Sequence, residues 1–268
     1  RAIGLVINDI SNPLFSGIAR AMDMQLVGNG FSLLIGNTDN DPRRERLIIE
    51  SLNQRRVDGL AITLSDERDP DTIALLERTT CPIVLLDRDL EIEVDSVCDD
   101  HAGGMKKAMR YLFDLGHRDI ALITGDDAVR PGRERARGFH EACREHGIQI
   151  APDRVRQGSL DSTFGFEQSC DLLLGTPRPS ALIAGGNQIL SGVLRALREF
   201  AIRIPTDLSL ICCDEIDLTV VMNPPITVIR RDVRRTGKLA ADLLLKRIGG
   251  EAGAEPCHPI LATELVVR

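Results

Sequence analysis

The sequence predicts an α/β protein with two doubly wound parallel-sheet subdomains joined by crossing strands, and three observations support this fold class. Short runs rich in Val, Ile and Leu alternate with longer stretches of helical period, which is typical of β-α-β units. The alternation runs to about Asp100 and starts again near Arg118, so the 268 residues divide into two similar halves. After Cys213 the order of elements changes, which indicates that the chain returns to the first half.

Buried strands and the helices between them account for most of the chain up to Cys213. The strands are expected at Ile3–Ile7, Phe31–Ile35, Gly59–Thr63, Ile83–Asp87, Asp119–Thr124, Val155–Gln157, Ala181–Ala184 and Leu208–Cys213. The helices are expected at about 14–28, 43–56, 71–79, 101–116, 133–147, 163–175 and 187–200. Asp41-Pro42 and Asp69-Pro70 mark helix starts, because aspartate caps a helix and proline fits its first position. Gly116 and Gly147 mark helix ends, where glycine tolerates the left-handed cap.

The last part of the chain is expected to serve both halves. A strand at Ile226–Ile229 precedes a helix at about 232–248, and a final strand lies near Ile260–Val267. The late helix has no following unit in register, which indicates that it completes the first half. We therefore expect an N-terminal subdomain of residues 1–99 plus 232–258 and a C-terminal subdomain of residues 100–231 plus 259–268.

Charge and cysteine content limit the possible partners and compartment. The chain has 33 Lys and Arg against 40 Asp and Glu, a net charge of -7, which argues against a broad nucleic-acid-binding face. Seven cysteines form an odd, irregularly spaced set that suits buried thiols in a reducing cytoplasm. The first residues lack both an initiator Met and a signal segment, so we expect a cytoplasmic protein and a chain that is a fragment or processed product.

The sequence contains no motif that carries a known enzymatic chemistry. Gly28-Asn29-Gly30 lacks the third glycine of the dinucleotide fingerprint and follows a helix instead of a strand. His140 and His146 stand about 240° apart on a regular helix and cannot share a metal with Cys143. The acidic pairs Asp99-Asp100 and Asp126-Asp127 favour turns, caps or pocket walls over catalysis. We expect no catalytic residue, no metal and no cofactor.

Several segments, taken in order, carry a resemblance to a known family over essentially the whole chain. They include Asp9–Phe15, Asn37–Asp39, Gln54–Gly59, Asp87-Arg88, Leu115–Ile123, Arg133–Phe139, Ile204–Ser209, Asn223–Arg230 and Glu264–Arg268. The chain resembles the effector-binding domain of bacterial transcription regulators of the lactose-repressor and galactose-repressor type.

This resemblance implies a fold of the type I periplasmic-binding-protein-like class and a sensing function. It implies a small effector held in the cleft between two lobes, a homodimer, and control of operator DNA through an upstream helix-turn-helix headpiece absent from this chain. The same fold leaves open a periplasmic sugar-binding protein of a transporter as the alternative. An enzyme acting in the cleft is a third possibility, supported only by scattered carboxylates. No membrane contact is expected.

The resemblance also places candidate ligand-binding residues, mostly at strand ends. They are Asn8, Asp9, Asn12, Phe15, Ser65, Asp87, Arg135, Leu160, Asn187 and Asp214. Carboxylates and a guanidinium suit sugar hydroxyls, which both donate and accept hydrogen bonds. Other roles stay open for some of them: Arg135 could lie on a solvated helix face, Asn12 could open the turn that Pro13 fixes, and Phe15 could belong to the core.

Two departures from the family pattern bear on the effector. Asn187 stands where an aspartate is usual, and Leu160 stands where several members place an aromatic platform. With no Trp and one Tyr in the chain, little aromatic surface is available to stack on a flat ring. The expected effector is therefore a sugar, a polyol or a sugar acid, and not a purine.

Overall fold

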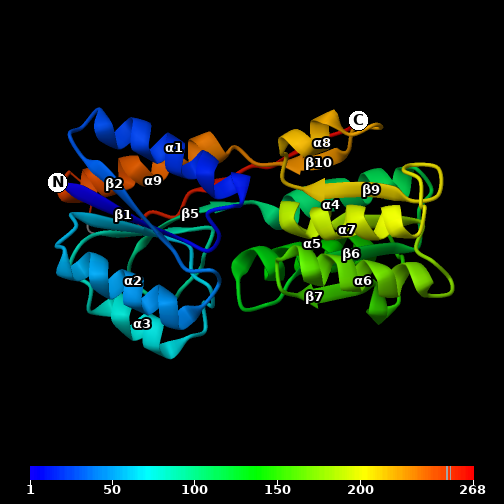
Figure 1. Ribbon diagram of the computed structural model, residues 1–268, viewed down its shortest axis with the longest axis horizontal. Coiled ribbons are helices and arrows are strands. Elements are labelled where there is room, and N and C mark those ends of the chain that lie inside the picture. Colours follow the sequence, from blue (N-terminus) through cyan, green and yellow to red (C-terminus); the bar gives the residue numbers. More distant parts are fainter. Residues whose placement is uncertain (252, 254) are drawn as a thin grey trace. The chain divides into compact units, whose positions relative to one another are not determined.

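The computed structural model describes residues 1–251, 253 and 255–268 of the chain. The described chain divides into two compact units, each with a sheet between layers of helices (Figure 1). Unit 1 comprises Arg1–Asp99, Ala128–Arg130 and Asp232–Leu261, and unit 2 comprises Asp100–Asp127, Pro131–Arg231 and Ala262–Arg268. The predicted fold class, two parallel-sheet α/β subdomains, is confirmed.

Unit 1 contains a sheet in the order β11-β5-β4-β3-β1-β2, and all of its neighbouring strands are parallel. The strands are β1 (Ala2–Ile7), β2 (Ser32–Asn37), β3 (Gly59–Ile62), β4 (Ile83–Leu86), β5 (Asp95–Asp99) and β11 (Ile260–Leu261). The helices are α1 (Pro13–Val27), α2 (Pro42–Gln54), α3 (Pro70–Glu77) and α9 (Val233–Ile248). Each of these helices has an aspartate or asparagine at its N-cap, whose side chain accepts a hydrogen bond from a backbone N–H of the first turn.

Strand β1 shows why the strands of this sheet have continuous apolar sequences. Alternate side chains of a strand point to opposite faces, and both faces of this sheet are covered by helices. Ile3 and Leu5 pack with residues of α1 and α9, whereas Val6 packs with residues of α2 and α3. All three side chains are buried.

Helix α9 packs against α1, although more than 200 residues of sequence separate the two. Gly237 allows this approach, because a Cβ atom at that position would lie 2.5 Å from the backbone oxygen of Ile18. A larger side chain would therefore push α9 away from α1. Because α9 packs against α1, it belongs to unit 1.

Unit 2 has a second sheet, in the order β12-β10-β9-β8-β6-β7. Its strands are β6 (Ile120–Gly125), β7 (Val155–Gly158), β8 (Ala181–Ala184), β9 (Ser209–Cys213), β10 (Thr227–Arg230) and β12 (Glu264–Val266), the last of which is antiparallel to β10. Its helices are α4 (His101–Asp114), α5 (Arg130–Glu145), α6 (Ser162–Leu174), α7 (Asn187–Glu199), the short α8 (Asp217–Val221) and the 3₁₀ turn at Pro152–Arg154. One core forms where α4 and α5 cover the sheet, and the other where α6 and α7 cover it.

Several features differ from the elements predicted from the sequence, among them the 3₁₀ turn at Pro152–Arg154. Strand β5 was not predicted, because its sequence Asp95-Ser96-Val97-Cys98-Asp99 lacks an apolar run. The last predicted strand is two strands, β11 and β12, which belong to different sheets. Helix α8 was also missed, since its five residues are too few to show a helical period.

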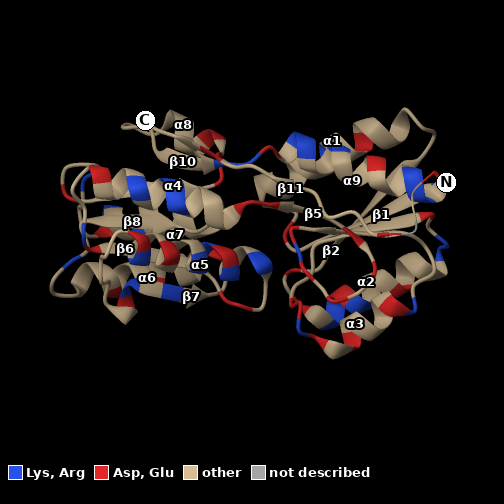
Figure 2. Cartoon of the chain, turned by 180° about the vertical axis from the view of Figure 1, so that it is seen from behind, with Lys and Arg blue, Asp and Glu red and all other residues tan. Residues whose placement is uncertain are grey.

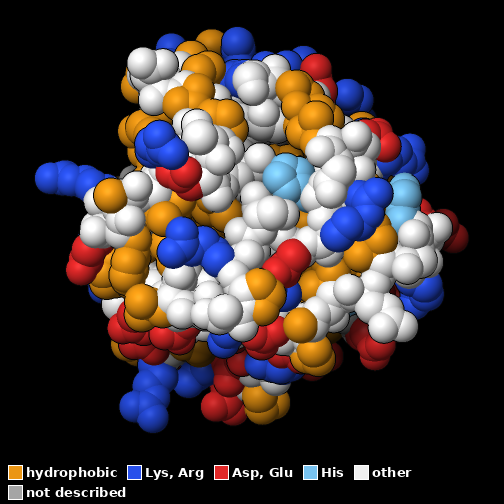
Figure 3. All heavy atoms as spheres, turned by 90° about the vertical axis from the view of Figure 1, so that its right-hand side faces the viewer, with side chains coloured by type: hydrophobic (Ala, Val, Ile, Leu, Met, Phe, Trp, Pro, Cys, Tyr) orange, Lys and Arg blue, Asp and Glu red, His pale blue; other side chains and the backbone are white. Residues whose placement is uncertain are grey.

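Charge is distributed over both units. Lys and Arg as well as Asp and Glu occur on the helices and loops of each unit (Figure 2). On the face drawn in Figure 3, basic side chains are interspersed with acidic and apolar ones. Among the described residues, no helix combines the length and the apolar character needed to cross a membrane.

Candidate functional site

Most of the predicted site residues follow the carboxyl ends of parallel strands. In unit 1, Asn8 follows β1 and Asp87 follows β4. In unit 2, Asn187 follows β8 and Asp214 follows β9. Ligands of parallel α/β sheets bind at such carboxyl ends, where loops and helix starts present polar groups. Each unit therefore has its own set of candidate groups at this edge of its sheet.

Asn8 and Ser65 form the centre of a buried hydrogen-bond chain in unit 1. Asn8 Nδ2 donates to Ser65 Oγ at 3.2 Å, and Ser65 donates from both its backbone N (2.7 Å) and its Oγ (2.8 Å) to Glu45 Oε2. Asn8 Oδ1 accepts from Arg88 Nη2 at 3.4 Å. The chain therefore has a guanidinium at one end and a carboxyl group at the other.

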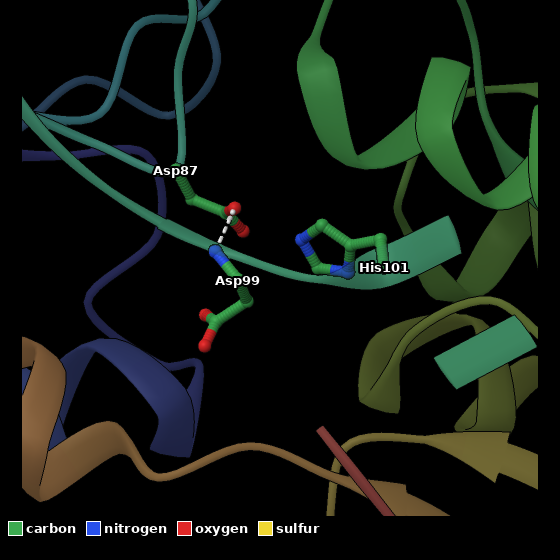
Figure 4. A group of neighbouring side chains, drawn as sticks. All are labelled: Asp87, Asp99 and His101. Carbon is green, nitrogen blue, oxygen red and sulfur yellow. Dashed lines mark hydrogen bonds between the residues drawn. The ribbon is translucent and has the colours of Figure 1, made fainter. Parts of the chain in front are cut away.

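Asp87 belongs to a second polar cluster of unit 1. Its backbone has a φ of 55°, in the left-handed region, and its Oδ1 accepts a hydrogen bond from Asp99 N at 3.3 Å (Figure 4). Arg130 Nη1 lies 3.5 Å from Asp87 Oδ1 and donates to the backbone oxygen of Asp99 at 2.8 Å. The arginine thus ties the ends of β4 and β5 together.

Arg88 lies beside this cluster and is almost completely buried. Its Nε donates to the backbone oxygen of Leu64 at 2.7 Å and lies 3.9 Å from Glu67 Oε1. Burial lowers the pKa of Arg88, although the negative charges of Glu67 and Asp87 oppose this shift. Satisfied donors and nearby carboxylates are what make a buried guanidinium tolerable.

The remaining three residues predicted in unit 1 belong to the start of α1. Asn12 is the N-cap of this helix, with its Oδ1 accepting from Leu14 N at 3.0 Å. Asp9 Oδ1 accepts from the backbone N (2.8 Å) and Oγ (2.6 Å) of Ser11. Phe15 is half-buried and packs against the core of unit 1. All three thus have structural contacts within the unit.

Arg135 and Asp214, both predicted to bind the ligand, come together in unit 2. The Arg135 side chain is buried on α5, where Nη1 donates to the backbone oxygen of Gly185 at 2.5 Å and Nη2 lies 3.9 Å from Asp214 Oδ2. The other carboxylate oxygen of Asp214 accepts from Arg231 Nε at 2.5 Å. Arg135 therefore does not lie on a solvated helix face.

The electrostatics of Asp214 follow from this pairing. Burial by itself would raise the pKa of the carboxyl group, but the positive charges of Arg231 and Arg135 outweigh it and hold the pKa below its ordinary value. Asp214 is therefore ionised at neutral pH. Its backbone has a φ of 80°, a left-handed conformation at the end of β9.

Leu160 and Asn187 complete the predicted set in unit 2. Leu160 is half-buried between β7 and α6, and its side chain fills the space beside Gly125, where a Cβ atom would lie 3.0 Å from Leu160 Cγ. Asn187 is buried and is the first residue of α7.

Five residues of these clusters were missed from the sequence: Glu45, Glu67, Arg88, Arg130 and Arg231. Glu45 left one signal, because it shares a helix face with Ile49 and Leu52 at a spacing of four and then three residues, and that face is buried. The arginines left none, since each stands among other charged residues in the sequence.

Comparisons with known proteins agree with this architecture. Residues 109–268 match the family described as a periplasmic binding protein-like domain. The chain is 32% identical over 247 residues to the ribose operon repressor of Escherichia coli K12, an alignment that covers 92% of this chain and 75% of that protein.

Solved structures with the same fold include two regulators of related sequence. A transcriptional regulator CelR-cellobiose complex superimposes with a TM-score of 0.91 at 27% identity, covering 100% of this chain and 83% of the other. The lac repressor dimer bound to operator and the anti-inducer ONPF superimposes with a TM-score of 0.86 at 26% identity, covering 100% and 80%.

Proposed function

The chain belongs to the LacI family of transcription regulators, and from that premise we propose that it is the effector-binding domain of a repressor that senses a small sugar-like metabolite. The ribose operon repressor of Escherichia coli K12 is a repressor by name, and this similarity favours a repressor domain over the alternative of a transporter's periplasmic sugar-binding protein. The proposal assigns no catalysis, metal or cofactor to the chain.

One observation carries the proposal of a hydroxyl-rich effector: buried polar groups gather at the carboxyl edge of each sheet. Unit 1 offers the amide of Asn8 and the carboxylate of Asp87, and unit 2 offers the guanidinium of Arg135 and the carboxylate of Asp214. These groups include strong donors and strong acceptors. Sugar hydroxyls act as both, so a polyhydroxylated molecule suits the polar groups that each unit presents.

A flat aromatic effector fits the same groups poorly. Purines and aromatic glycosides are commonly held by stacking, which contributes about 0.5–1.5 kcal/mol per aromatic pair beyond the buried area. Leu160 is aliphatic, and Phe15 packs against the core of unit 1. A sugar, a polyol or a sugar acid is therefore the proposed class.

Effector binding is proposed to change how the full-length protein binds operator DNA. The ribose operon repressor is longer than this chain, because the alignment covers 75% of it. The family resemblance implies a helix-turn-helix headpiece upstream. An effector that binds one conformation of a dimer better than another shifts the population toward it. The lac repressor was solved as a dimer on its operator, which supports a homodimer and a cytoplasmic site of action here.

Thermal-shift screening tests the effector class directly. We expect D-ribose, cellobiose, other sugars, polyols or sugar acids to include at least one compound that raises the melting temperature, and nucleobases to leave it unchanged. Because a ligand that binds only the folded state stabilises it by mass action, a true hit must show a concentration-dependent shift. Stabilisation by a purine alone, with none by any polyhydroxylated compound, would overturn the proposal.

A further inference from the structure

Glu45 is a fully buried carboxyl group behind the polar edge of unit 1. It lies in the first turn of α2, and its Oε2 accepts two hydrogen bonds from Ser65. Its Oε1 is buried and has no hydrogen-bond partner among the described residues. An isolated buried carboxyl group is costly, so a residue of this kind needs a specific reason to be there.

The hydroxyl of Ser65 has all of its hydrogen-bonding capacity occupied. A serine hydroxyl has one donor and two acceptor positions. The proton goes to Glu45 Oε2, so the contacts from Asn8 Nδ2 (3.2 Å) and Thr38 Oγ1 (3.3 Å) must both be donated to Ser65 Oγ. With the carboxylate in place, Ser65 can therefore only accept from Asn8.

This direction fixes the amide of Asn8. Its Nδ2 must face Ser65, and its Oδ1 then faces Arg88 Nη2 at 3.4 Å. The reversed amide would place an oxygen against a hydroxyl that has no proton to give and an N–H against a guanidinium. Asn8 keeps one N–H and one lone pair for another partner.

We propose that Glu45 is a positioning residue of the effector site, which acts through Ser65 to hold the Asn8 amide in a single orientation. The proposal rests on the proposed function for the identity of the site, but the orientation of Asn8 is a property of the ligand-free protein. In this proposal Ser65 does not contact the effector itself but connects Glu45 to Asn8.

The groups that act on Glu45 make its ionisation responsive near neutral pH. Burial raises the pKa of Glu45 to about 7, the two Ser65 hydrogen bonds and the charge of Arg88 oppose this, and the charge of Asp69 adds to it. Asp69 is itself paired with Arg46, which weakens its effect. Protonation of Glu45 would remove the charge that orders the chain of hydrogen bonds.

Nuclear magnetic resonance of the ligand-free protein tests the positioning role. We expect the Asn8 side-chain NH₂ signals, assigned by their loss in Asn8→Asp, to shift between about pH 5 and about pH 9 with a midpoint near 7, as the pKa of Glu45 requires. The shift should vanish in Glu45→Gln and in Ser65→Ala. Ser65→Ala removes the link without touching the carboxyl group, so it serves where a Glu45 variant folds poorly. Signals that do not respond to pH in the unaltered protein, or that respond equally in Ser65→Ala, would overturn the proposal.

Calorimetry with D-ribose, or with the sugar that screening identifies, tests the consequence for binding. Glu45→Leu removes the acceptor of the Ser65 hydroxyl and should weaken binding about 5- to 20-fold, whereas Glu45→Gln keeps an acceptor and should stay within about threefold. Equal affinities for Glu45→Leu and the unaltered protein would overturn the role in binding. If the Asn8 signals shift with pH as expected but no sugar binds, the positioning role of Glu45 stands and only the proposed sugar-sensing function is contradicted.

Discussion

Arg247 donates two hydrogen bonds to the carboxylate of Asp95, from Nε to Oδ2 and from Nη2 to Oδ1, both at 2.8 Å. Asp95 is only 2% exposed and also accepts from Cys257 N at 2.7 Å. The pair joins the end of α9 to the start of β5, across 152 residues of sequence. It therefore secures the returning segment of the chain to the sheet of unit 1.

Removal of this arginine should destabilise the fold. Arg247→Ala leaves a buried carboxylate without its cation, and we expect the free energy of unfolding to fall by about 2–4 kcal/mol in urea titrations. Arg44→Ala is the matched control, because Arg44 pairs with Asp39 on the surface of the same unit and should change stability by less than about 1 kcal/mol. Equal losses in the two variants would show that the buried pair has no special role.

The same pair explains why β5 escaped prediction. Strand signals in a sequence are apolar runs, and the sequence Asp95–Asp99 begins and ends with a carboxylate. Its polarity is compensated by Arg247 and Cys257, which no local pattern connects to it. By contrast, β1 and β6 are buried on both faces and therefore have the continuous apolar sequences from which they were predicted.

Arg135 and Asp214 are expected to contribute directly to effector binding. Each charge-assisted hydrogen bond contributes about 1.5–3 kcal/mol, so Arg135→Ala should weaken binding by about 10- to 150-fold in calorimetry. Asp214→Ala should show a loss in the same direction. Arg137→Ala is the matched control, since Arg137 lies two residues further along α5 and pairs with Glu134 and Glu141 on the surface. Unchanged affinity in both Arg135→Ala and Asp214→Ala would remove these residues from the site.

Only the site residues that lie at strand ends or match the family resemblance could be predicted from the sequence. Asn8, Asp87 and Asp214 directly follow strands, and position alone brings such residues to one edge of a sheet. Glu45 and Arg88 act from behind that edge, through contacts between segments far apart in sequence. The helical spacing of Glu45 with Ile49 and Leu52 indicates that its helix face is buried, but no local pattern in the sequence indicates which side chains it contacts.

The burial of Glu45 should make stability fall as pH rises. Its pKa is about 7 in the folded protein and 4.5 as the ordinary value, so the folded state binds more protons than the unfolded state between these values. Its contribution to stability is complete below about pH 4.5 and is lost as pH rises through about 7, with a magnitude on the order of 3 kcal/mol. In urea titrations across this range, the unfolding free energy of the unaltered protein should therefore fall relative to that of Glu45→Gln as the pH rises. A difference independent of pH would show that Glu45 ionises normally in the folded state.

The cysteines should differ widely in their rates of alkylation. All seven are free thiols, and burial raises the pKa of Cys98, Cys143 and Cys213 to about 11, against a reference value of 9.0. The thiolate is the reactive form, so these three combine low accessibility with a very small thiolate fraction at neutral pH.

Cys257 is exposed and provides the internal comparison. With iodoacetamide under native conditions, mass spectrometry of peptides should find Cys257 alkylated first and the three buried cysteines only after unfolding. In urea all of them should react at similar rates, because the differences come from the folded structure. Early labelling of Cys213 in the native protein would show that the end of β9, which leads into Asp214, opens far more readily than its buried strand predicts.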